Sequence, residues 1–83
     1  MTGPKLNREE ALVMVAEAEM AGELGRCLYR GFQCRIMKNG VVLGRLPDGA
    51  WVPYATRRDD ITLEEWLAEA TKALENAPDW VKV

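Results

Sequence analysis

Turn-forming residues divide the middle of this chain into short segments, and this feature limits the fold more than any other. Asn39-Gly40 follows a run in which apolar and polar side chains alternate. Asn-Gly between two such runs favours a two-residue hairpin loop, because both loop positions need a positive φ. That loop pairs Ile36 with Leu43 and Lys38 with Val41. The expected core face then carries Phe32, Cys34, Ile36, Val41 and Leu43.

A second turn signal, Pro47-Asp48-Gly49, precedes a third expected strand over residues 50–56. Pro53 has no N–H to donate to a neighbouring strand, so it predicts that this strand lies at an edge. Two registers remain open. A two-residue loop places Trp51 on the outer face of the sheet, whereas a three-residue loop with a bulge places it in the core.

The segment before the strands has the pattern of a helix that starts near residue 8. Asn7 and Glu10 form a capping pattern, in which each side chain can satisfy a free backbone N–H of the first turn. Gly22 and Gly25 are both candidate terminators, because glycine tolerates the left-handed conformation that ends many helices. The helix therefore ends near residue 20 or near residue 24.

This first helix carries more apolar surface than one buried stripe needs. Small, uncharged residues form the core stripe at positions 11, 14, 15, 18, 21 and 22. Val13, Met20 and Leu24 form a second apolar row on another side. A second row predicts contact with another copy of the chain or with a partner protein.

The last helix has the clearest boundaries. Thr62 and Glu65 form a capping box, and Ile61 and Trp66 have the spacing of a hydrophobic staple. Leucine, tryptophan and alanine side chains repeat at helical spacing along one stripe. Pro78 and the residues just before it end the helix.

The order of these segments predicts one small α+β domain over residues 1–83. We expect a helix, a three-stranded antiparallel meander and a second helix (αβββα), in two layers with both helices on one face of the sheet. Residues 1–6 are expected to be a flexible lead. The tail at 79–83, which contains Trp80, is expected to pack back onto the domain.

The sequence contains few of the residues and motifs on which catalysis usually depends. It contains no histidine, and Cys27 and Cys34 belong to no Cys-x-x-Cys motif. No group of residues has zinc-ligand spacing, and the glycines form no phosphate-binding loop. We therefore expect a non-enzymatic protein without cofactor or metal. Both cysteines are expected to be reduced, with Cys34 buried in the core.

Apolar runs are too short for a membrane span. The longest covers six residues, 11–16, whereas a span needs about 20. The first residues also lack the basic and apolar pattern of a secretory signal. These features favour a cytoplasmic protein that does not bind membranes.

Charge is distributed unevenly along the chain. Residues 1–25 carry a net charge of −3, residues 26–58 carry +6, and residues 59–83 carry −5. The helices are therefore acidic and the strands basic. Basic strands with tyrosine and tryptophan can bind nucleic acid, while acidic helices can bind a basic protein surface; the net charge of −2 favours the second.

Two groups of residues are candidates for partner binding. Arg35, Met37 and Trp51 would form an open patch of the kind that is common in protein interfaces. The second group is acidic and would steer a basic partner: Asp59, Asp60, Glu64, Glu65 and Glu69.

Together these observations favour a small protein-interaction module that works by blocking a surface or by scaffolding. Phage-encoded inhibitors of host nucleic-acid-handling complexes, such as anti-CRISPR proteins, belong to this functional class. Two alternatives stay open. One is a nucleic-acid-binding domain that uses the basic meander, and the other is a structural subunit that forms a homodimer or larger assembly through Val13, Met20 and Leu24.

Overall fold

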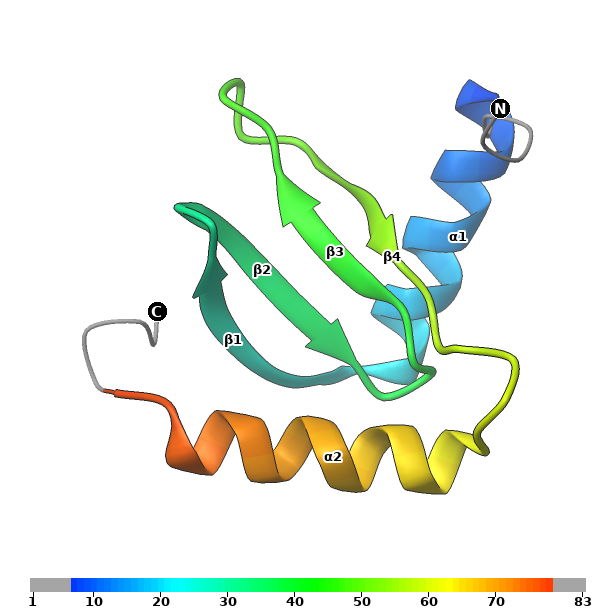
Figure 1. The fold of residues 1–83 in the computed structure, drawn as a ribbon. Coiled ribbons are helices and arrows are strands. Elements are labelled where there is room, and N and C mark those ends of the chain that lie inside the picture. Colours follow the sequence, from blue (N-terminus) through cyan, green and yellow to red (C-terminus); the bar gives the residue numbers. More distant parts are fainter. Residues whose placement is uncertain (1–6, 79–83) are drawn as a thin grey trace.

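The computed structural model describes residues 7–78, so the expectations for 1–6 and 79–83 lie outside the described residues. Four strands form one antiparallel sheet in the order β1-β2-β3-β4, with a helix before it and a helix after it (Figure 1). The predicted α+β class, with helices flanking an antiparallel meander, is confirmed. The elements are α1 (Arg8–Ala21), β1 (Glu23–Tyr29), β2 (Phe32–Met37), β3 (Val42–Arg45), β4 (Trp51–Ala55) and α2 (Leu63–Asn76).

The additional strand, β1, follows the first helix directly. Gly22 has a φ of 96° and its N–H bonds back to the Ala18 carbonyl, so α1 ends at Ala21. Leu24 therefore lies on β1, and its expected place in the helical row with Val13 and Met20 is corrected. Asn7 caps the start of α1 as predicted, accepting a hydrogen bond from the Glu10 N–H.

The β1–β2 hairpin has a two-residue loop of the kind that was predicted at Asn39-Gly40. Arg30 and Gly31 connect the strands with φ values of 52° and 83°, so both loop residues are left-handed, as a type I′ turn requires. Tyr29 then lies opposite Phe32, and Cys27 opposite Cys34.

The β2–β3 loop is longer than predicted. The Met37 N–H donates to the Val41 carbonyl at 2.9 Å, so the loop holds three residues, 38–40. The left-handed φ is at Gly40 alone, because Asn39 does not have one. Ile36 therefore pairs with Val42, and the predicted pairing of Ile36 with Leu43 is wrong by one residue. A shift of one residue exchanges the two faces of β3.

The β3–β4 loop also holds three residues, Pro47, Asp48 and Gly49. The Leu46 N–H donates to the Ala50 carbonyl at 2.8 Å, and Gly49 has a φ of 92°. Trp51 consequently lies opposite Arg45 and packs against the core. Of the two registers considered for this strand, the three-residue loop is the one present.

These registers divide the apolar residues between the two faces of the sheet. Met37 and Leu43 face α1 and are fully buried with Ala18. Cys34, Ile36 and Val42 lie on the opposite face together with the inner side of α2. The helices thus cover opposite faces, with α1 behind β4 and α2 across the lower end of the sheet (Figure 1). The predicted two-layer arrangement is corrected to three layers, α1, the sheet and α2, because the apolar residues expected on one face of the sheet are divided between both faces.

Candidate partner-binding surface

An open groove of about 380 Å³ lies between α2 and the sheet. Its floor consists of side chains from β1, β2 and β3: Cys27, Cys34, Ile36 and Val42. Its α2 wall is formed by Trp66, Glu69, Ala70 and Ala73. We call this feature the α2 groove; it is within the size range of pockets that take apolar ligands or side chains.

The α2 groove exists because α2 touches the sheet near its two ends and carries small residues between them. At one end Leu74 packs on Gly25, where the absence of a side chain lets the helix approach β1. At the other end Trp66 lies near Gly40 in the β2–β3 loop. Ala70 and Ala73, which lie between these contacts, have side chains too short to fill the space above the strands.

Aromatic side chains form the far rim of the groove. Tyr29 is 48% exposed and Tyr54 is 47% exposed, and their rings meet edge to face at a centroid distance of 5.9 Å. Phe32, opposite Tyr29, is 52% exposed but lies beyond the groove lining. Exposed aromatic rings beside an apolar floor are typical of surfaces that bind other proteins.

Trp66 links the groove to the packing of α2. Its ring is partly buried, and its Nε1–H is buried without a hydrogen-bond partner among the described residues. A buried donor without an acceptor costs about 1–3 kcal/mol. Trp66 thus stabilises α2 through its apolar ring and not through a polar contact.

The two cysteines face each other on the floor of the groove. Cys34 is buried, as predicted, and Cys27 is partly exposed. Burial raises the pKa of both thiols, and the neighbouring Cys27 raises the pKa of Cys34 further. Both side chains are therefore thiols and not thiolates at neutral pH.

The predicted open patch of Arg35, Met37 and Trp51 does not form. Met37 is fully buried under α1, because α1 covers this face of the sheet. The Arg35 side chain is only 11% exposed and its guanidinium binds two carboxylates, Glu19 on α1 and Glu23 on β1. The prediction that these three residues form an accessible patch is therefore corrected.

Arg35 instead organises a charged network at the edge of α1. Its Nε donates to Glu23 at 2.5 Å, and the same carboxylate accepts a bond from Arg26 at 2.8 Å. Trp51 lies beside both guanidinium groups, with centroid distances of 5.2 Å to Arg35 and 5.9 Å to Arg26. Partial burial raises the pKa of the Glu23 carboxyl, but the bonds and charges of Arg35 and Arg26 outweigh burial and hold that pKa below its ordinary value.

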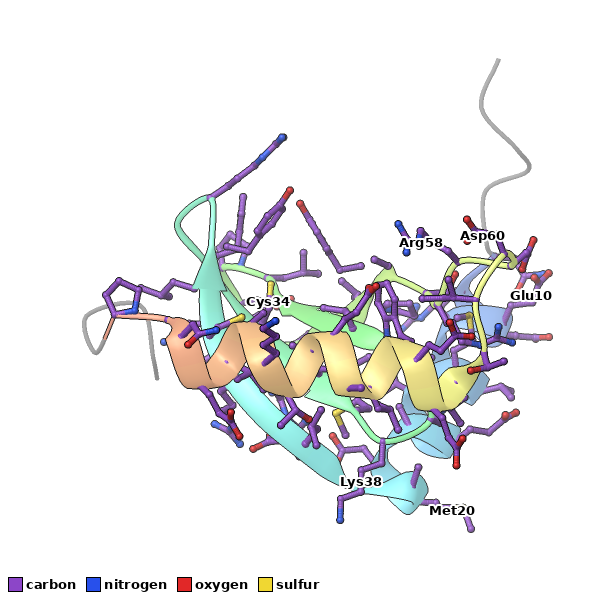
Figure 2. The ribbon with its side chains drawn as sticks, turned by 60° about the horizontal axis from the view of Figure 1, so that its bottom comes forward. Glu10, Met20, Cys34, Lys38, Arg58 and Asp60 are labelled. Atoms are coloured by element: carbon purple, nitrogen blue, oxygen red, sulfur yellow. The ribbon has the colours of Figure 1, made fainter. Side chains whose placement is uncertain are left out.

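The predicted acidic residues are all exposed, but they do different things. Glu65 closes the capping box with Thr62, whose backbone and side-chain hydrogen bonds lower the pKa of the Glu65 carboxyl. Asp60 and Glu69 lie 3.5 Å and 3.6 Å from the Arg58 guanidinium, and Figure 2 shows Arg58 beside Asp60. Neither Asp59 nor Glu64 has an ion-pair partner among residues 7–78.

Glu69 is the one member of this acidic group that lines the α2 groove. The structure therefore brings a predicted residue into contact with a surface that the sequence reasoning missed. The groove was missed because it needs β1, which supplies Cys27 and Tyr29. The signal for it was the alternation of Gly25, Cys27 and Tyr29 ahead of the Arg30-Gly31 turn.

Two of the three residues of the predicted apolar row, Val13 and Met20, lie on α1 and are exposed. Val13 is 55% exposed and Met20 is 90% exposed, and Figure 2 shows Met20 pointing away from the fold. Leu12, 61% exposed, extends this row. Leu24, on β1, is partly buried.

Comparison with protein-family models, curated proteins and solved structures found no match for this chain. Between residues 7 and 78, the His, Cys, Asp and Glu side chains form no cluster of three that could hold a metal ion. Neither described helix has the length and apolar character needed to span a membrane.

Proposed function

We propose that this protein is a small interaction module that binds a partner protein through the α2 groove. The observation that carries the proposal is the groove itself, which is an open apolar hollow with an exposed aromatic rim on a protein of only 83 residues. An apolar surface exposed to water does not contribute to the free energy of unfolding, which is small in a domain of this size. A partner side chain that fills the hollow would remove this apolar area from water.

The partner we propose has an apolar anchor beside lysine or arginine. Within residues 7–78, Glu69 is the only charged residue that lines the groove. Asp59 and Glu64, near the start of α2, have carboxylates without an ion-pair partner in the described part of the chain. A basic residue next to the anchor would meet Glu69, while Asp59 and Glu64, which do not line the groove, would act at longer range and chiefly raise the association rate.

A blocking role is the finer form of this proposal. A basic patch on a protein often serves to bind nucleic acid, so a module that covers it would inhibit such a protein in the way that phage-encoded inhibitors do. This role also assumes that the protein works in the cytoplasm, where such complexes are found. The groove supports binding, and inhibition is the consequence that we propose for it.

A selection from a random-peptide library tests the groove directly. Ala73→Arg would fill the groove, whereas Ala68→Arg makes the same change on the exposed opposite side of α2. Both are arginine in place of alanine in the same helix, so their effect on helix propensity is matched. We expect selected peptides to bind the wild type and Ala68→Arg, and to lose at least tenfold in affinity for Ala73→Arg.

The selected sequences test the chemistry of the partner. We expect an aromatic or aliphatic residue next to lysine or arginine, and weaker binding to Glu69→Gln. Peptides that bind Ala73→Arg as well as they bind the wild type would contradict the groove as the binding site. Peptides without basic residues would contradict only the proposed charge of the partner.

A further inference from the structure

The two cysteines occupy opposite positions on neighbouring strands. Cys27 on β1 is the direct partner of Cys34 on β2 in the antiparallel register. Directly opposed residues have side chains on the same face of the sheet, and both side chains line the α2 groove. Figure 2 shows Cys34 on the sheet behind α2.

This placement satisfies the main geometric requirement for a disulfide. Directly opposed residues of antiparallel strands have Cα atoms about 4.5 or 5.5 Å apart, and disulfides join Cα atoms about 4.4–6.8 Å apart. Their Cβ atoms are about 4.5–5.5 Å apart, slightly more than the distance that a relaxed disulfide prefers. A bond formed here would be somewhat strained, and strained disulfides are the readily reduced ones.

Access to the pair differs between its two members. Cys27 is partly exposed and faces an open groove, whereas Cys34 is 2% exposed. A small disulfide molecule can therefore reach the Cys27 sulfur first. The buried Cys34 can then react with a sulfur that is already beside it.

We propose that Cys27 and Cys34 are a thiol–disulfide exchange site that reacts with a low-molecular-weight disulfide such as glutathione disulfide. The Cys27 thiol loses its proton and attacks one sulfur, which breaks the glutathione S–S bond and releases one glutathione. The Cys34 thiol then loses its proton and attacks the Cys27 sulfur, which releases the second glutathione. Two protein thiols are oxidised, one glutathione disulfide is reduced, and the two protons end on the two glutathione thiols.

Intact-mass measurement in glutathione redox buffers tests this site. The full-length wild type is incubated with glutathione disulfide and quenched in acid, and its intact mass is then measured by mass spectrometry without reductant. We expect a monomer that has lost two hydrogens, that recovers them on addition of dithiothreitol, and whose peptide map links residue 27 to residue 34. Cys34→Ser should stop at a stable glutathione adduct, because the resolving thiol is gone.

Cys27→Ser provides the matched control, since it should react much more slowly than Cys34→Ser. Circular dichroism confirms that each variant is folded, and the peptide map of the wild type needs no variant. The proposal is overturned if the folded wild type accumulates glutathione adducts, forms only disulfide-linked dimers, or stays reduced in buffers that oxidise a reference dithiol. Because no partner takes part, this test is independent of the proposed binding function.

Discussion

Arg35 holds together three parts of the fold through its guanidinium group. It joins α1 through Glu19 and β1 through Glu23, and it lies beside the Trp51 ring of β4. Hydrogen bonds that involve charged groups contribute more than neutral ones, and the loss of Arg35 would leave Glu19 without this partner and Glu23 with Arg26 alone.

Arg35→Ala is therefore expected to lower the free energy of unfolding by about 2 kcal/mol. Arg58→Ala is the control, because the Arg58 pairs are exposed and longer and exposed pairs contribute about 0–1 kcal/mol. Urea denaturation followed by tryptophan fluorescence measures both. Equal losses in the two variants would show that the Arg35 network is no stronger than a surface ion pair.

Glu23 makes the same network sensitive to acid. Its pKa is lower in the folded protein than the ordinary value of 4.5, so its stabilising contribution is complete above that value and is lost as the pH falls through the lowered pKa. Glu23→Gln should lower the melting temperature at pH 7. The difference between Glu23→Gln and the wild type should then shrink as the pH falls below 4.5, which thermal melts at a series of pH values would detect; a constant difference would argue against the role of this carboxylate.

One close contact with β1 helps to set the position of α2. A methyl group added at Gly25 would lie 2.6 Å from a Leu74 methyl carbon, so the side chain of Leu74 must move to admit it. Overpacking of this kind costs about 1–3 kcal/mol.

We expect Gly25→Ala to destabilise the protein within that range, and to cost much less when Leu74→Ala is already present. Denaturation of the four proteins of this double-mutant cycle gives the coupling between the two positions. If Gly25→Ala costs the same in both backgrounds, then the clash does not determine how α2 packs.

Elements with strong local signals were predictable from the sequence. The capping box of Thr62 and Glu65 identified the start of α2, and Asn7 identified the start of α1. β1 had only a weak signal, the alternation of Gly25, Cys27 and Tyr29, because Arg30 supplies the first left-handed residue of its hairpin loop and arginine rarely does so. Without β1, the sequence could not reveal the α2 groove.

The length of the β2–β3 loop could not be predicted from the local sequence. Asn39-Gly40 is compatible with a loop of two residues or of three, and the packing of Met37 and Leu43 against α1 goes with the longer one. This single residue decides whether Leu43 joins Ile36 or faces the opposite helix. Met37 stays on the same face of β2 in either case, and it lies in the core because α1 covers that face.

The apolar row on α1 gives the whole molecule a second surface without a described partner. Met20 is 90% exposed and Val13 is 55% exposed. We expect light scattering to show concentration-dependent self-association of the wild type, and a shift toward monomer for Met20→Glu. Ala68→Glu adds the same charge on the exposed side of α2 and serves as the control. A wild type that stays monomeric at all concentrations would assign this row to a different protein.

The net charge of −2 and the ion pairs of three arginines both oppose nucleic-acid binding. Arg26 and Arg35 are paired with Glu23, and Arg58 with Asp60. We therefore expect no submicromolar binding of random duplex DNA at physiological salt, as measured by fluorescence anisotropy. Tight binding that weakens steeply with added salt would favour the basic meander as the functional surface.

The strand order also governs how the molecule assembles from the unfolded chain. Each strand pairs only with its neighbour in the sequence, through loops of two or three residues. Short loops lose little chain entropy when they close, and domains with mostly local contacts fold quickly. The α2 groove, in contrast, needs residues from β1 and from α2, which are separated in the sequence by β2, β3 and β4. The sheet can therefore form early, while the groove is completed last and is the first feature to disappear when α2 detaches.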